Sequence, residues 1–349
     1  MRLEPISSPT LARSLGYPVA ALGLSVVVAS FLALLAGANP FATLGLILKG
    51  AAGSQFAVLE TLNRATPLIF TGLAVAVAFR AKLWNIGAEA QLYMGALITV
   101  IFGTSALGLP GPQPLILIAT AAMIGGGLML LGPVILKTRF GVDEVVTTLL
   151  LNFIMLLFIS LLLEGPLKDP MGMGWPKSPR LDPDARLPRI IDGLRLHWGF
   201  ALALICAAVV WVIETRTTLG YEIRAVGQNP RAARFSGIPV NLVLLKTALL
   251  SGGLAALAGF SEVAGLKGSL TLDLSPGFGY TGIIVAMLAL LHPIGVVFSA
   301  IFVAGVFVGA DSMSRAAGVP TYIADILLAT ALLFMVLAIL LTRFRIVRG

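Results

Sequence analysis

The chain consists of long apolar runs separated by short polar segments. Each run approaches the roughly 20 residues that an α-helix needs to cross a hydrocarbon core about 30 Å thick. Nine runs are clear: Gly16–Ala38, Thr66–Phe79, Leu92–Leu109, Pro114–Leu136, Val145–Leu163, Trp198–Ile213, Val240–Gly259, Pro293–Ala310 and Tyr322–Leu341. A tenth, Tyr280–Leu291, is apolar but short. We therefore expect an all-α fold with about ten transmembrane helices, forming one membrane domain over residues 1–349.

The composition agrees with a polytopic membrane protein. Only 11% of the 349 residues are charged and 58% are hydrophobic, whereas a soluble domain is about one quarter charged. One cysteine, Cys206, lies in an apolar run, and only two histidines, His197 and His292, accompany it. A disulfide framework and a zinc-ligand spacing are therefore both excluded, and we expect neither a metal nor a cofactor.

The basic residues predict an orientation. Ten crossings place both termini on one side, and the short loops on that side carry the excess of lysine and arginine that marks the cytoplasm. We therefore expect both termini to be cytoplasmic, in the inner membrane. The segment Glu164–His197 contains six prolines and mixed charge, which disfavours regular helix. It is predicted to be an external loop with some ordered turns.

The net charge of +8 does not indicate nucleic-acid binding, because the basic residues are spread over separate short loops. No glycine-rich phosphate loop ending in Gly-Lys-Ser/Thr is present. Neither a His/Asp cluster nor a nucleophile and base pair is evident, so we expect a transport protein without a catalytic residue rather than an enzyme. Any ATP hydrolysis must then occur on a separate subunit.

The stretch Leu83–Ala96 carries Asn85, Glu89 and Gln91 directly after basic residues, with no room for an aqueous loop. Polar groups at mid-membrane cost about 2–3 kcal/mol each and normally face a bundle interior or a water-filled path. Asn85 and Glu89 are four residues apart and share a face if the segment is helical. The spacing alone leaves open whether they line a path or only cap the start of a helix.

This stretch resembles the signature Asn-Ile-Gly-Ala-Glu-Gly-Gln of permease subunits from ABC importers of the nucleoside and simple-sugar class. That class belongs to a wider family that includes branched-chain amino acid and ribose permeases. Here Ala90 replaces the usual second glycine. The segments Pro67–Ala74 and Gly141–Thr148, with Asn152 beyond the latter, are also similar to the family. The resemblance extends from about residue 40 to the end.

The second informative stretch is predicted to form a short cytoplasmic helix at about residues 229–237. Asn229 is a good N-cap, Pro230 suits the first helical position, and Gly237 can close the helix. A solvated connector is the alternative interpretation. The resemblance implies a coupling helix that inserts into a groove on the ATPase subunit. Its candidate coupling residues are Gly227, Asn229, Arg231, Ala232, Ala233, Arg234 and Gly237.

A third stretch, Gly277–Leu288, has glycines at 277, 279 and 282 that permit a backbone break. Broken helices at membrane depth are tolerated where they are buried or line a cavity, and transporters place substrates there. Packing without a ligand is the alternative. Each half of the chain contains a glycine-rich polar interruption, which is compatible with an inverted repeat relating spans two to five to spans seven to ten. The candidate substrate path consists of Asn85, Glu89, Gln91, Asn152 and Tyr280.

The sequence therefore predicts the permease subunit of an ATP-driven importer of nucleosides or simple sugars. The resemblance implies three partners in addition to the lipid bilayer: an ABC ATPase, a second related permease in a heterodimer, and an extracytoplasmic substrate-binding lipoprotein. An ion-coupled secondary transporter of small polar solutes is the alternative, with Glu89 as its one strong coupling carboxylate.

Overall fold

The computed structural model describes residues 2–5, 11–35, 37–104, 113–191, 193–318 and 320–347. These residues are almost entirely helical. The helices are α1 Leu11–Leu35, α2 Pro40–Ala52, α3 Gln55–Arg80, α4 Ala88–Gly103, α5 Gln113–Phe140, α6 Glu144–Glu164, α7 Gly199–Arg216, α8 Thr218–Gln228, α9 Pro230–Phe235, α10 Val240–Ser261, α11 Phe278–Leu288, α12 Pro293–Ala317 and α13 Tyr322–Arg343. A 3₁₀ turn, η1, covers Pro183–Ala185, and a π-helical turn, η2 (Glu262–Lys267), extends α10.

The chain divides into two compact units, which are described separately. The first contains Met1–Thr61 and Phe302–Gly349, and in it α1 packs along α13. The strands β1 (Arg2–Pro5) and β2 (Phe344–Val347) pair antiparallel in the same unit, with Arg2 opposite Val347. The second unit, Leu62–Ile301, contains the predicted substrate-path and coupling residues. The single domain expected from the sequence stays a prediction.

Each of the ten predicted runs falls on a helix, although residue 36 of the first run and residues 105–109 of the third lie outside the described residues. Among the described helices, six are long and apolar enough to cross a membrane: α3, α5, α6, α7, α10 with η2, and α12. The bent pair α1 and α2 forms a candidate seventh, and α4, α11 and part of α13 are shorter apolar helices. The polytopic helical fold is thus confirmed, whereas the count of ten crossings stays a prediction.

Two helices, α2 and α8, were not expected from hydropathy. Asn39 caps α2, because its side-chain oxygen accepts a hydrogen bond from the Phe41 amide at 3.0 Å and Pro40 occupies the first turn. The α8 helix is amphipathic and buries Ile223 and Val226. α2 is apolar but, at 13 residues, too short to be recognised as a span. α8 has one polar face, so its average hydropathy is low and only its cap and periodicity indicate a helix.

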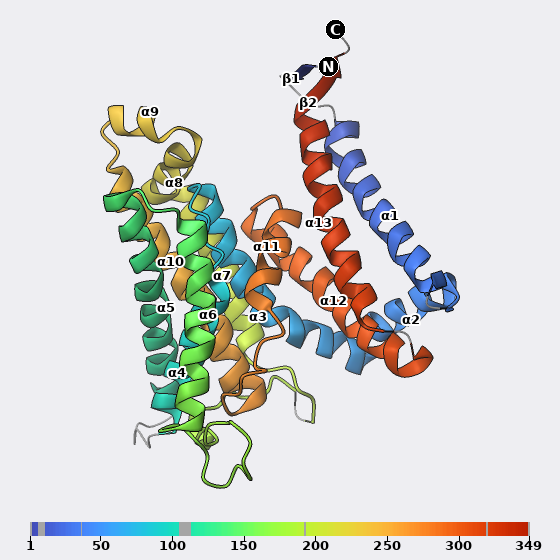
Figure 1. Cartoon of the computed structure of the whole chain (residues 1–349), viewed down its shortest axis with the longest axis vertical. Coiled ribbons are helices and arrows are strands. Elements are labelled where there is room, and N and C mark those ends of the chain that lie inside the picture. Colours follow the sequence, from blue (N-terminus) through green and yellow to red (C-terminus); the bar gives the residue numbers. More distant parts are fainter. Residues whose placement is uncertain are drawn as a thin grey trace. The chain divides into compact units, whose positions relative to one another are not determined.

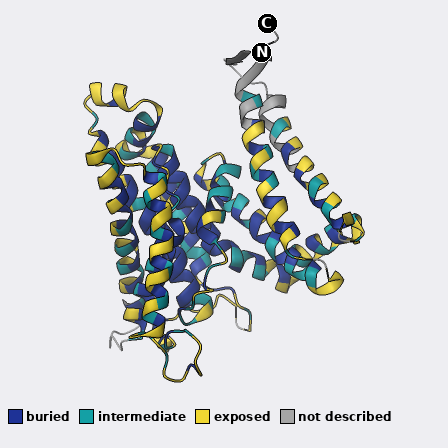
Figure 2. Ribbon diagram, viewed as in Figure 1, coloured by how far each residue is buried: buried dark blue, intermediate teal, exposed yellow. Residues whose placement is uncertain are grey.

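The core of the second unit is formed by α10 lying against α4 and α5. Small residues allow the close approach. A Cβ atom on Gly95 would lie 2.0 Å from the Ala256 carbonyl oxygen, and one on Gly259 would lie 1.9 Å from the Leu92 oxygen. In the outer helices α5, α6 and α7, by contrast, only 28%, 22% and 28% of the residues in the apolar stretch are buried (Figure 2), as expected of lipid-facing helices. The apolar surface therefore surrounds a core of small residues.

The two ends of the second unit differ. The helices α8 and α9 lie at one end, and the long loop between α6 and α7 lies at the other (Figure 1). Backbone hydrogen bonds fasten this loop to the segment after α10, from Leu181 N to Gly268 O at 2.9 Å and from Leu187 N to Ala264 O at 2.8 Å. The expected ordered turns are present, and the predicted coupling helix and external loop lie at opposite ends.

Candidate functional site

The candidate site begins at a break between α3 and α4. After α3 ends at Arg80, Lys82 adopts a positive φ of 52°, and the chain stays irregular until α4 starts at Ala88. Side chains of α6 hold this irregular segment. Thr148 Oγ1 accepts a hydrogen bond from the Ile86 amide at 3.2 Å, and Asn152 Nδ2 donates to the Ile86 oxygen at 2.9 Å. The exposed backbone of the break is therefore satisfied by a neighbouring helix.

Asn85 and Gln91 form a closed amide pair across the break. Asn85 Nδ2 donates to Gln91 Oε1 at 2.9 Å, and Gln91 Nε2 donates back to Asn85 Oδ1 at 3.0 Å. Asn85 Nδ2 also donates to Ser251 Oγ of α10, whose hydroxyl in turn donates to the Ala74 carbonyl of α3 at 2.7 Å. Asn85, Gln91 and Ser251 are fully buried. This network joins α3, α4 and α10, and its groups are already partnered by protein.

Glu89 lies where the first turns of α4 and α11 meet. Its Oε2 accepts a hydrogen bond from the Gly279 amide at 2.6 Å, and the residue is 3% exposed. A Cβ atom on Gly279 would lie 2.2 Å from the Glu89 nitrogen, so the two backbones are in contact. Helix N-termini carry partial positive charge, so the meeting of two of them favours a carboxylate. The break predicted before the short helix is thus present, and α11 begins at Phe278.

Asn152 and Tyr280 complete the cluster. Asn152 Oδ1 accepts a hydrogen bond from the Ala90 amide at 2.9 Å, and its Nδ2 lies 3.0 Å from the Tyr280 hydroxyl. Asn152 is fully buried, whereas Tyr280 is 39% exposed. The five predicted path residues therefore lie in one cluster built from α4, α6, α11 and the break. Within it, Tyr280 presents an open face and Asn85 and Gln91 lie behind.

Two residues of the cluster were missed by sequence reasoning. Ser251 is a single hydroxyl in the apolar run of α10, and Tyr93 of α4 donates from its hydroxyl to the Leu272 oxygen at 2.6 Å. The position of Tyr93, four residues after Glu89 on the same helix face, was an available signal. Ser251 gave no signal beyond the two glycines that follow it.

The predicted coupling helix is α9. Asn229 Oδ1 accepts hydrogen bonds from the Arg231 and Ala232 amides, each at 3.1 Å, and Gly237 closes the segment at a φ of 83°. Ala232 and the arginines Arg231 and Arg234 are exposed. The predicted cap, its proline and the closing glycine are all found as expected.

The other two coupling candidates lie inside. Ala233 is 4% exposed, and Gly227 of α8 is buried against the end of α3. A Cβ atom on Gly227 would lie 1.8 Å from the Arg80 carbonyl oxygen. These two residues pack α8 and α9 against the bundle. The exposed surface of α9 is formed by Arg231, Ala232 and Arg234.

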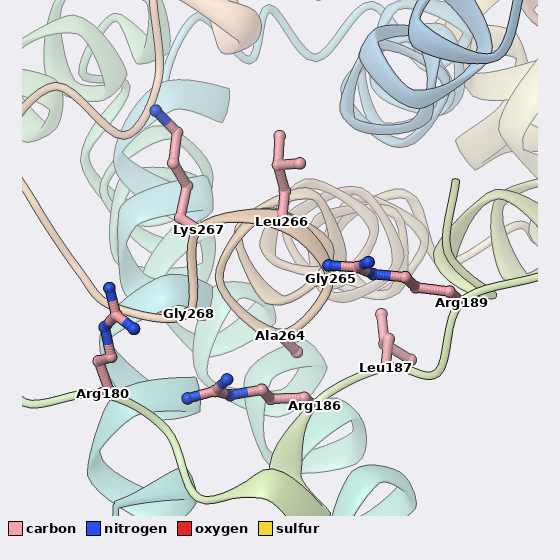
Figure 3. A pocket seen from close by; sticks show the side chains of 9 residues that line it. All are labelled: Arg180, Arg186, Leu187, Arg189, Ala264, Gly265, Leu266, Lys267 and Gly268. Atoms are coloured by element: carbon pink, nitrogen blue, oxygen red, sulfur yellow. The ribbon is translucent and has the colours of Figure 1, made fainter. Parts of the chain in front are cut away.

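At the opposite end, four basic residues surround a pocket of about 280 Å³ that we call the arginine pocket: Arg180, Arg186, Arg189 and Lys267. They gather around the turn that ends η2 (Figure 3). Arg186 is held in place because its Nη2 donates to the Leu181 oxygen at 2.8 Å. No acidic side chain is among the described residues that line the pocket. Such a surface attracts anionic groups.

The family model described as "Branched-chain amino acid transport system / permease component" matches residues 57–337. The glucose ABC transporter permease protein TsgB13 of Haloferax volcanii is 33% identical over 356 residues, covering 99% of this chain and 93% of TsgB13. The guanosine ABC transporter permease protein NupP of Bacillus subtilis is 35% identical over 333 residues, covering 91% and 92%. NupQ, a second guanosine ABC transporter permease protein of that organism, is 30% identical over 254 residues, covering 70% and 78%.

These matches agree with the resemblance in the motif around Glu89, and they favour a transport component of an ABC system over an ion-coupled secondary transporter. Because the family model spans most of the chain and two relatives align over nearly its whole length, this chain belongs to the ABC-transporter permeases of the branched-chain amino acid transport system permease family.

Proposed function

We propose that this chain is the transmembrane subunit of an ATP-driven importer that moves nucleosides or simple sugars across the cytoplasmic membrane, with both termini on the cytoplasmic side. The substrate class is supported by the relatives named for guanosine and glucose. The observation that carries the proposal is the polar cluster at the meeting of α4 and α11, two helices that begin inside the bundle. Discontinuous helices are where transporters bind solutes.

The solute path runs past the open part of this cluster. Nucleosides and sugars consist mainly of hydroxyls, ring nitrogens and a ring face, so they need hydrogen-bond partners and an aromatic surface. Tyr280 offers its exposed ring and hydroxyl, and Asn152 and Glu89 stand behind it. Asn85 and Gln91 do not contact the solute directly. Their reciprocal hydrogen bonds fix the position of the first turn of α4.

Three protein partners complete the transporter. An ATPase subunit binds the exposed surface of α9, which suits a groove because Ala232 is small and Arg231 and Arg234 are free to contact it. A second, related permease forms a heterodimer with this chain, and the pair NupP and NupQ from one organism supports that arrangement. An extracytoplasmic substrate-binding lipoprotein docks at the end that carries the arginine pocket.

ATP binding and hydrolysis on the separate subunit drive the cycle. Closure of the ATPase displaces α9, and the bundle alternates between two arrangements that open the path to one side or the other. Such a shift requires ligands that bind the two arrangements with different affinity. ATP and the loaded binding protein supply that difference, and this chain makes or breaks no covalent bond.

The test is reconstitution in vesicles with the partner subunits, measuring uptake of radiolabelled guanosine or glucose with ATP on the ATPase side. We expect uptake to require ATP and to persist without an ion gradient. Replacing Arg231 and Arg234 together with Glu is expected to leave insertion intact and to lower uptake and solute-stimulated ATP hydrolysis, because the contact surface changes charge. The matched control changes Arg139 and Arg216, which are exposed outside α9, to Glu. Uptake that follows a proton gradient without ATP contradicts the proposal.

A further inference from the structure

A buried ion pair connects α3 to α7 at the end of the unit where α8 and α9 lie. The Arg80 Nη1 atom, in the last residue of α3, lies 3.0 Å from Glu214 Oε2 in the last turn of α7. The Glu214 side chain is 2% exposed and the Arg80 side chain 20% exposed. Replacing such a pair by apolar side chains is often neutral or stabilising, so its presence is weak evidence for a role in stability.

A third charged residue, from α8, joins this pair. Arg224 Nη1 donates a hydrogen bond to the main-chain oxygen of Glu214, and its charge also acts on the Glu214 carboxylate. Neither carboxylate oxygen has a hydrogen-bond partner among the described residues, although Arg80 lies close by. The carboxylate thus keeps acceptor capacity that Arg224 can reach by a small movement of α8. Arg224 therefore has two alternative acceptors on one residue, and networks with two discrete arrangements are what carry coupling between sites.

Two glycines of α8 make close backbone contacts with the ends of α7 and α3 that carry the ion pair. Gly220 lies on the last turn of α7, where a Cβ atom would approach the Glu214 Cα atom to 2.5 Å. Gly227 lies on the last carbonyl of α3, that of Arg80. The ionic contacts and the glycine contacts therefore involve the same two helix ends. A movement of α8 toward α7 or α3 therefore displaces Glu214 or Arg80.

The group of Arg80, Glu214 and Arg224 lies between α9 and the polar network at Asn85. In one direction α8 ends at Gln228, and the next residue, Asn229, caps the start of α9. In the other direction Arg80 is followed by the tight turn at Lys82 and then by Asn85, the first member of the polar network. Helix α3 is also tied to that network through its Ala74 oxygen, which accepts from Ser251. The path from α9 to the start of α4 is short and consists of packed elements.

We propose that Arg80, Glu214 and Arg224 form a strap that transmits the displacement of α9 to the break at Asn85, so that they are positioning residues for transport. The strap rests on the proposed function, because it requires an ATPase to displace α9. During the displacement Arg224 moves from the Glu214 main-chain oxygen to its carboxylate, and Arg80 carries the shift into the α3 end. No strap residue contacts the solute.

The test compares Glu214→Gln with a matched control, Glu222→Gln, which makes the same chemical change at a partly exposed position of α8. In vesicles containing the complete transporter, the number of solute molecules moved per ATP hydrolysed is measured together with the KM for the solute-loaded binding protein. We expect Glu214→Gln to lower the ratio by about tenfold, within the range that loss of a coupling residue produces. The KM and the copurification of the ATPase are expected to stay unchanged, as they are in Glu222→Gln.

A second variant keeps the proposal testable if Glu214→Gln fails to insert. Arg224→Gln leaves the Arg80 and Glu214 pair in place, so the bundle is expected to fold, and the ratio is again expected to fall. Arg224→Lys keeps a positive charge that can reach the same oxygens. It is expected to recover part of the solute transport per ATP that Arg224→Gln loses. A ratio within twofold of the wild type in Arg224→Gln overturns the strap. Absence of ATP-driven uptake in the wild-type vesicles overturns the proposed function instead, so the two failures are distinguishable.

Discussion

Glu89 and Glu214 are carboxylates buried to similar extents in one helical body, at 3% and 1% exposure, yet they are stabilised in different ways. Glu89 lies in the first turn of α4, beside the first turn of α11, and accepts a main-chain hydrogen bond from Gly279. Glu214 lies in the last turn of α7, where the helix dipole disfavours negative charge. It depends on Arg80 and Arg224 instead.

The difference indicates what each carboxylate can do. Helix termini and main-chain amides are fixed, so the carboxylate of Glu89 stays in place while Tyr280 beside the cluster keeps an open face for a solute. Arginine side chains are long and can exchange partners, so the surroundings of Glu214 can be rearranged without unfolding a helix. We therefore associate fixed backbone donors with the solute path and mobile side-chain cations with the joint.

The largest effect is expected where the fixed donors depend on a glycine. Gly279→Ala places a Cβ atom 2.2 Å from the Glu89 nitrogen, so α4 and α11 must separate. Overpacking of this kind costs about 1–3 kcal/mol, and here it also displaces the Gly279 donor. We expect uptake to be abolished and the thermal midpoint in detergent to fall.

Gly132→Ala in α5 is the control for that change, because nothing lies within 4 Å of its added Cβ atom. It should leave both uptake and the thermal midpoint near the wild type. Wild-type uptake by Gly279→Ala would mean that the contact between the two helix starts is dispensable.

The next largest effect separates the charge of Glu89 from its hydrogen bond. Glu89→Gln keeps the size and an acceptor for the Gly279 amide, so uptake should fall only modestly. Glu89→Ala leaves that buried amide unpaired at a cost of about 1–3 kcal/mol, and uptake should fall much further. The measurement is ATP-driven uptake for both variants, with and without a pH gradient.

An ion-coupling carboxylate behaves differently, because there the charge itself is required. In that case Glu89→Gln abolishes uptake as completely as Glu89→Ala. Wild-type uptake in both variants removes Glu89 from the path.

The sequence predicted the residues of the cluster better than it predicted their arrangement. Polar side chains in an apolar run are costly, so Asn85, Glu89 and Gln91 stood out by chemistry alone. Asn85 and Gln91 bond each other over six positions, but Glu89 depends on Gly279, 190 positions away, and Asn85 also depends on Ser251, 166 positions away. No local pattern reports such contacts. The division between the open Tyr280 and the closed amide pair was therefore visible only in the structure.

The fold was predictable in a similarly uneven way. Hydropathy located the lipid-facing helices α5, α6 and α7 with good boundaries, because lipid exposure demands a continuous apolar run. It placed the start of α3 eleven residues late, at Thr66 instead of Gln55, because the first turns of α3 carry Glu60, Asn63 and Arg64. The ion pair between Arg80 and Glu214 was missed entirely, since each residue resembled an ordinary one at a span end.

A smaller effect is expected from the closed amide pair, and a double-mutant cycle measures it. Asn85→Ala leaves Gln91 without its partner, and Gln91→Ala does the same to Asn85. The double variant removes both groups, so its loss of stability should be smaller than the sum of the single losses, with a coupling of about 0.5–3 kcal/mol. Unfolding in detergent, followed by tryptophan fluorescence, gives the three values. Additive losses would show that the two amides act independently.

The smallest effect concerns a third buried ionisable group, His197, which lies outside the membrane-spanning segments. Its Nδ1 accepts a hydrogen bond from the Gly199 amide at 3.1 Å, and its buried Nε2 has no partner among the described residues. Burial lowers the pKa of His197 from 6.5 to about 4. As the pH falls below 6.5, the unfolded chain therefore takes up a proton that the folded chain refuses, and stability decreases. The loss is about 1 kcal/mol near pH 5.5 and grows until the folded form also titrates near pH 4.

His197→Asn offers an acceptor to Gly199 but does not titrate, so its thermal midpoint should depend less on pH over this range. The difference between the two midpoint curves isolates the histidine from every other titrating group. Parallel curves would mean that His197 is protonated equally in the folded and unfolded chains, and that its burial carries no electrostatic cost.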